Sequence, residues 1–84
     1  MSYGQAEGTR PLITLEKLRK GERGVIKYLP GVELRARALR LGLATGDRVE
    51  CLSVLPGGPV VIEVRGQEVA VGRNLARRIL IAPL

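Results

Sequence analysis

Histidine is absent from the 84 residues, and cysteine occurs only once, at Cys51. The absence of histidine removes the side chain that most often serves as a general acid, a general base or a metal ligand. A structural zinc site needs about four Cys or His ligands, and the eight acidic residues are scattered, with no pair at ligand spacing. These absences argue against an enzyme, a resident metal and a cofactor.

Aromatic residues are nearly absent as well, since the chain holds two tyrosines and neither Phe nor Trp. The core must therefore be aliphatic, and eleven glycines and five prolines favour short strands and tight turns. No apolar stretch approaches the roughly 20 residues of a membrane helix, and no secretory signal is visible. A single cysteine cannot form an internal disulfide. We expect one soluble, cytoplasmic domain.

Two glycine-containing segments, Gly21 to Gly24 and Gly57-Gly58, invite comparison with phosphate-binding loops. Neither is followed by the Lys-Ser or Lys-Thr that opens the helix of such a loop, so both are interpreted as turns. Cys51 falls within a strand pattern, and no base is present to activate it. We interpret it as a buried core residue rather than a nucleophile.

The chain divides into a short tail and one domain. Residues 1–11 show no periodicity and are predicted to be flexible, which leaves residues 12–84 as the domain. At the start of the domain, Leu12 to Leu18 predicts about one helical turn, with Thr14 as its cap.

One segment, Val32 to Leu41, has the pattern of a well-formed helix. Leu34, Ala38 and Leu41 recur with a 3.6-residue period, so they are predicted to face the core. Gly42 stands where a left-handed C-cap is expected.

The remaining segments predict strands and turns. Gly66-Gln67 suits a type II′ hairpin turn, which would place Arg65 opposite Glu68 as a favourable cross-strand pair. Short strands joined by tight turns indicate a mainly β, closed or nearly closed small barrel, with one short α-helix after the first strand. Five strands are predicted, at 24–29, 48–55, 60–65, 68–71 and 79–81, with a short helical turn at 73–78.

Taken in order, the motifs of residues 12–84 resemble the ferrous-iron transport protein A family, FeoA. The most specific piece is the helix that runs into Leu-Gly-Leu, followed by Gly-Asp-x-Val. The matching residues are Leu15, Leu18, Gly21, Gly24-Val25-Ile26, the helix at 33–39, Leu41-Gly42-Leu43, Thr45 to Glu50, Gly66, Asn74-Leu75-Ala76 and Ile79.

The resemblance implies an SH3-like barrel, in agreement with the strand pattern. It implies a cytoplasmic accessory role in bacterial ferrous-iron uptake, through contact with the membrane permease that carries a GTPase domain (FeoB-type). The same domain is similar to the C-terminal module of iron-dependent repressors, whose DNA-binding domain this chain lacks. The family offers no catalytic residues to carry over, and the absence of histidine argues against direct iron binding.

The helix offers the candidate partner-binding surface, made of Arg35, Leu39 and Arg40. Leu39 lies roughly 140° from Leu34 around the helix, with Arg35 beside it and Arg40 beyond. An exposed leucine flanked by arginines has the character of an interface hot spot, and it also offers a surface for self-association. The alternative is that Leu39 packs under the N-terminal segment while the arginines are merely solvated.

Two other functions remain open from the sequence. The formal charge of +6 suits a small nucleic-acid-binding barrel, but the dearth of aromatic residues argues against it, because single strands are usually held by stacking. A metal-responsive regulatory module is the third alternative. The charge is equally compatible with an ordinary solvated surface.

Overall fold

The computed structural model describes residues 11–84, so the predicted tail lies outside the described residues except for Pro11. The five predicted strands and the long helix begin and end within one or two residues of their predicted bounds. In chain order the elements are β1 (Ile13–Thr14), η1 (Leu15–Lys17), β2 (Arg23–Tyr28), α2 (Val32–Arg40), β3 (Arg48–Val54), β4 (Val60–Val64), β5 (Gln67–Val71), α3 (Arg73–Ala76) and β6 (Leu80–Pro83).

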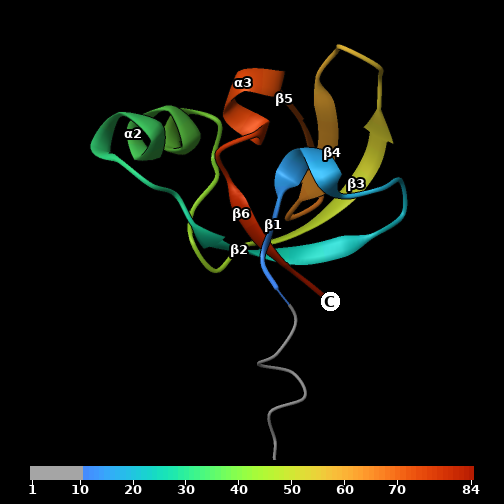
Figure 1. Cartoon of the computed structure of the whole chain (residues 1–84), viewed down its shortest axis with the longest axis horizontal. Helices are drawn as coiled ribbons and strands as arrows, with labels where there is room; N and C mark the ends of the chain where they lie inside the picture. Colours follow the sequence, from blue (N-terminus) through green and yellow to red (C-terminus); the bar gives the residue numbers. More distant parts are fainter. Residues whose placement is uncertain (1–10) are drawn as a thin grey trace, which may run out of the picture.

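The strands form one antiparallel sheet in the order β1-β6-β2-β3-β4-β5 (Figure 1). It has six strands instead of the five predicted, because Ile13 and Thr14 pair with Ile81 and Leu80 of β6. The sheet curls into the SH3-like barrel that was predicted, and the mainly β fold is confirmed. The last strand, β6, lies between β1 and β2, so both ends of the domain meet in one part of the sheet.

The segment before β2 corrects one prediction. Its helical turn is the single 3-10 turn η1, and Thr14 stands at the N-cap position but makes no side-chain capping bond. The hydroxyl of Thr14 is buried and has no hydrogen-bond partner among the described residues. Thr14 is therefore a strand residue paired with β6, and backbone pairing, not side-chain capping, fixes it.

Aliphatic side chains fill the core, as the composition requires. Leucine, isoleucine, valine and alanine side chains, together with Cys51, are buried, and no polar or charged residue within 11–84 is buried with them. The core receives Leu15 and Leu18 from the N-terminal segment and Leu75 and Ala76 from α3. The helix α2 contributes only Leu34 and Ala38.

The C-terminus of α2 is a Schellman motif centred on Gly42, as predicted. Gly42 has φ of +83°, the left-handed region that glycine adopts without strain. The N–H of Leu43 donates to the carbonyl of Ala38, and the N–H of Gly42 donates to the carbonyl of Leu39, both at 2.9 Å. Leu43 is thereby folded into the core. Leu41, predicted to face the core, is 37% exposed, so Leu43 takes the buried place instead.

The β4–β5 hairpin turn differs from the prediction. The two turn residues are Arg65 and Gly66, with φ of +50° and +80°, which makes a type I′ turn rather than type II′. The register pairs Glu63 with Glu68, so the predicted Arg65–Glu68 pair is wrong. Arg65 is not a strand residue at all.

A tertiary contact explains why Arg65 occupies a conformation that non-glycine residues seldom adopt. Its guanidinium donates to the carboxylate of Asp47 at 2.6 Å and also to the carbonyl of Gly42. Asp47 in turn accepts from the N–H of Ala44 at 2.8 Å. The hairpin tip is thereby tied to the end of α2 and to the turn before β3.

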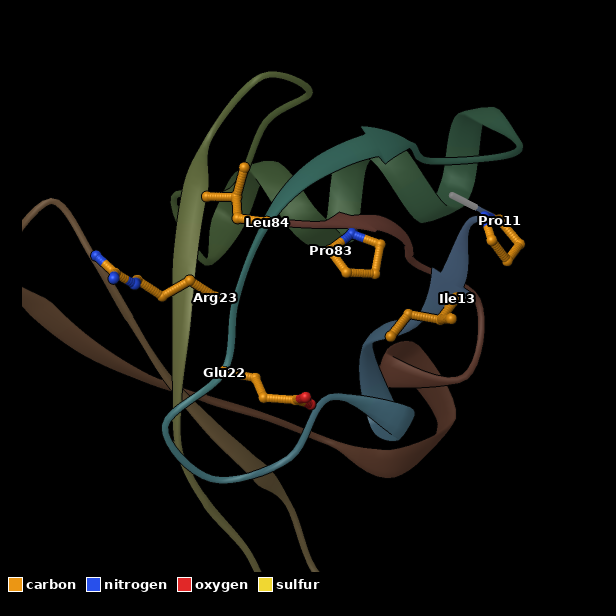
Figure 2. A pocket seen from close by; sticks show the side chains of 6 residues that line it. All are labelled: Pro11, Ile13, Glu22, Arg23, Pro83 and Leu84. Carbon is orange, nitrogen blue, oxygen red and sulfur yellow. The ribbon is translucent and has the colours of Figure 1, made fainter. Parts of the chain in front are cut away.

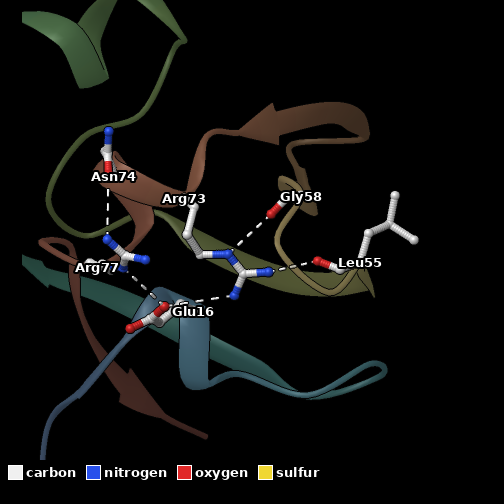
Figure 3. A network of polar contacts seen from close by, with 6 residues as sticks. All are labelled: Glu16, Leu55, Gly58, Arg73, Asn74 and Arg77. Carbon is white, nitrogen blue, oxygen red and sulfur yellow. Dashed lines mark hydrogen bonds and ion pairs between the residues drawn. The ribbon is translucent and has the colours of Figure 1, made fainter.

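A second arginine, Arg73, joins the β3–β4 loop to α3 and η1 (Figure 3). It donates to the carbonyls of Gly58 at 3.1 Å and Leu55 at 2.6 Å. Glu16 lies 3.7 Å from both Arg73 and Arg77, which places one carboxylate between two guanidinium groups. Since these contacts link segments far apart in the chain, they order a loop that contains two glycines and two prolines.

Gly24 gives a test of the close packing between β2 and β6. A Cβ atom at this position would lie 2.3 Å from Cγ2 of the buried Ile81 and 3.0 Å from the carbonyl oxygen of Ala82. We expect Gly24→Ala to lower the free energy of unfolding in urea by about 1–3 kcal/mol, because the core must shift to admit the methyl group. Gly72→Ser is the control, since a Cβ there meets nothing within 4 Å, the φ of −58° suits any residue, and serine is favoured at the N-cap position that Gly72 occupies in α3. Equal stability of the two variants would contradict the packing argument.

Candidate partner-binding surface

Helix α2 stands to one side of the sheet in Figure 1, and most of its surface faces solvent. All three predicted site residues, Arg35, Leu39 and Arg40, are exposed. Leu39 is 70% exposed and Val32 is 76% exposed, a large apolar area for side chains of this kind. These two residues are seven positions apart and so lie on nearly the same face of the helix.

One flank of α2 carries an apolar groove of about 210 Å³. We call this the apolar flank and define it by the groove residues together with the adjacent Val32. Arg35 donates to the carbonyl of Leu29 at 3.3 Å, so its guanidinium also anchors the chain just before the helix. The groove is lined by Leu29, Arg35, Leu39, Leu43, Ala44 and Thr45.

Arg40 belongs to the other flank of the helix. It lines a separate cleft of about 270 Å³ together with Arg37 and Leu41, opposite residues from the end of β5 and from α3. The structure therefore brings Arg35 and Leu39 together but places Arg40 apart from them. Arg37 was not singled out from the sequence, because only the position of α3 shows that the two arginines share a cleft.

A further concavity, of about 260 Å³, lies between the start of β1, the start of β2 and the end of β6 (Figure 2). Its one side-chain carboxylate, Glu22, accepts from the N–H of Arg19 at 2.7 Å and so fixes the turn before β2. Arg23 extends away from the other lining side chains in Figure 2. No paired acid and base converge here. We interpret the concavity as a consequence of how the strands are arranged.

Metal ligands do not gather anywhere in residues 11–84, where no group of three or more Cys, Asp or Glu side chains could hold an ion. None of the helices within the same residues is both long and apolar enough to cross a bilayer.

Comparison with known proteins then decides the family. The family model described as the FeoA domain matches residues 13–83, nearly all of the described chain. The chain belongs to the FeoA domain family. No protein in the curated set of sequences matches the chain.

Solved structures give the same assignment for this FeoA-domain chain. It superposes with a TM-score of 0.82 on a crystal structure described as an iron uptake regulatory protein (FeoA), at 28% identity over 88% of this chain and 100% of the other. It also matches the FeoA protein of Chlorobium tepidum, with a TM-score of 0.73 and 27% identity over 86% of this chain and 70% of that one.

The fold also occurs within larger regulators. A manganese-dependent transcriptional repressor matches 90% of this chain with a TM-score of 0.79 at 19% identity, and the match covers 44% of the repressor. At this identity the likeness shows a shared SH3-like fold. The sequence led us to expect similarity to the C-terminal module of iron-dependent repressors, and the likeness to this manganese-dependent repressor is of the same kind.

Cys51 of this FeoA-domain chain is fully buried, which confirms its interpretation as a core residue. Burial raises the pKa of its thiol; a backbone hydrogen bond at Ser53 opposes the shift, and the charge of Glu22 adds to the rise. Because the thiol is the unreactive form, Cys51 is protected both by its surroundings and by its protonation.

We therefore expect Cys51 to react with a thiol-specific disulfide reagent only when the domain opens. At mildly alkaline pH, the rate in the native protein should be at least about a hundredfold below the rate in denaturing urea, because core residues open only with a large fraction of the global unfolding free energy. Absorbance of the released thiolate measures both rates. Comparable rates would show that Cys51 is accessible.

Proposed function

We propose that this FeoA-domain chain is a non-catalytic, cytoplasmic accessory protein of ferrous-iron uptake. It acts by contacting the membrane ferrous-iron permease that carries a GTPase domain (FeoB-type), and it does so through the apolar flank of α2. The observation that carries the proposal is the pair of exposed side chains, Leu39 and Val32, beside an apolar groove. Family membership supports the connection to iron uptake.

Contact with a partner would bury the exposed side chains of the apolar flank and so contribute favourable free energy to binding. Fully burying a valine or leucine side chain is worth about 1.5–3 kcal/mol, and neither Leu39 nor Val32 receives this gain from the domain itself. Arg35 beside them carries a charge and an apolar stem, a combination that interface centres favour. The groove already contains the buried Leu43 and Leu29, which gives an incoming side chain an apolar floor.

Leu39→Glu tests the proposal. We expect it to weaken binding to the purified permease at least about tenfold, since a desolvated anchor is lost and a charge is introduced. Ferrous-iron uptake in cells that depend on the protein should fall in parallel. Leu55→Glu is the matched control, because Leu55 is also exposed, at 54%, but lies in the loop after β3.

Thermal melting of both variants shows whether the fold is intact. Leu39→Glu should leave the melting temperature nearly unchanged, because the side chain contributes little to the core. A folded Leu39→Glu variant that binds the permease as well as the parent protein would refute the assignment of the apolar flank.

A further inference from the structure

The second flank of α2 faces α3 across a cleft that the proposed function does not use. Arg37 and Arg40 supply its charge from α2, and Leu41, just after α2, and Leu75 of α3 supply apolar walls. We call it the arginine cleft; its lining residues are Arg37, Arg40, Leu41, Ala70, Gly72 and Leu75. No acidic residue lines it.

The two arginines of the cleft form no ion pair within the described residues, in contrast to others of the domain. Arg65 is paired with Asp47, and Arg73 and Arg77 share Glu16. Glu33 lies one helical turn before Arg37, but no ion pair within 4 Å joins it to Arg37 or Arg40. The cleft thus presents two positive charges that no carboxylate of residues 11–84 neutralises.

We propose that the arginine cleft binds an acidic segment of the partner protein, with a carboxylate held by Arg37 and Arg40 and an adjacent apolar side chain against Leu41 and Leu75. The inference rests on the proposed function, because the partner is the protein that the apolar flank of α2 contacts. Guanidinium groups bind carboxylates through paired, charge-assisted hydrogen bonds, which are stronger and more directional than those of lysine.

The shape of the site favours a protein segment over a lipid surface. Anionic membranes attract clusters of basic residues spread over a juxtamembrane segment or an amphipathic helix, whereas here two arginines line a concavity of about 270 Å³ with apolar walls. The lysines, Lys17, Lys20 and Lys27, stand on other parts of the fold, around η1 and β2. A concave site of mixed character suits alternating acidic and apolar side chains.

Gly72 allows the charge of the cleft to be changed without disturbing the fold. It is the N-cap residue of α3, with φ of −58° and ψ of 152°, and a Cβ there meets nothing within 4 Å. Asp and Asn are both favoured at N-caps, where they accept from the exposed backbone N–H groups of the first turn. Gly72→Asp therefore adds a negative charge inside the cleft, and Gly72→Asn is its uncharged match in size and capping.

The first probe is a fluorescently labelled hexapeptide of alternating Glu and Leu. Its binding to the 84-residue chain is measured by fluorescence anisotropy. We expect binding at about 0.05 M salt that weakens at about 0.5 M, where charges are screened beyond a few ångströms. Arg37→Ala and Arg40→Ala should each weaken binding at least fivefold, and Gly72→Asp should bind at least fivefold more weakly than Gly72→Asn. The same peptide with Gln in place of Glu should not bind.

The purified permease is the second probe, and it separates this inference from the proposed function. If Gly72→Asp weakens permease binding relative to Gly72→Asn, and Leu39→Glu also does so, both proposals hold. If only Leu39→Glu has an effect, the arginine cleft is not part of the interface and the inference is overturned while the apolar flank stands. If only the cleft variants act, the apolar flank is refuted and the cleft remains.

Three other results would also overturn the inference. One is equal peptide affinity of the Asp and Asn variants, and another is no detectable peptide binding at low salt. The third is binding to phosphatidylglycerol vesicles that depends on Arg37 and Arg40 while the peptide fails to bind, which would reassign the cleft to a lipid surface. Melting temperatures of all variants should stay close to that of the parent chain.

Discussion

Leu34 and Ala38 fix α2 on the barrel, and the Schellman turn at Gly42 folds Leu43 into the core directly after them. This line of contact is narrow, because a helix that buries only two of its nine residues leaves both of its flanks open. Arg65 reinforces it from the hairpin tip by donating to the carbonyl of Gly42. The apolar flank and the arginine cleft both exist because α2 is held only at its C-terminal end and along this one line.

The sequence allowed much of this fold to be predicted, since local signals agree with the final structure wherever they are strong. The helix period, the left-handed glycine at its end and the strand pattern around Cys51 each follow from side-chain type and spacing. The β4–β5 turn was mispredicted for a physical reason. A Gly in a short link fits either the first place of a type II′ turn or the second place of a type I′ turn. Here Gly66 takes the second place of a type I′ turn. The residue in the first place, Arg65, contacts Asp47, which is far away in the chain.

The candidate site was predictable in part. Helical spacing placed Leu39 away from the predicted core face with Arg35 beside it, but it left open whether the N-terminal segment packs over Leu39. It could not show that Arg40 belongs to a different cleft, because the opposite wall comes from Ala70, Gly72 and Leu75, some thirty residues later in the chain. Leu41 illustrates the same limit. Its spacing from Leu34 and Ala38 predicts that it faces the core, but the turn at Gly42 buries Leu43 there instead.

The division of α2 into two flanks bears on how binding and stability are related in this domain. Side chains that hold the barrel together, such as Leu34 and Ala38, are fully buried, whereas Leu39, Arg37 and Arg40 are exposed. Changes in the exposed set should therefore act on a partner with little effect on folding, since surface substitutions away from caps and networks usually change stability by less than about 0.5 kcal/mol. A partner that used both flanks would combine apolar burial with charge pairing on one short helix. The contribution of the arginine cleft to the affinity would then weaken as salt is added, whereas the contribution of the apolar flank would persist at high salt.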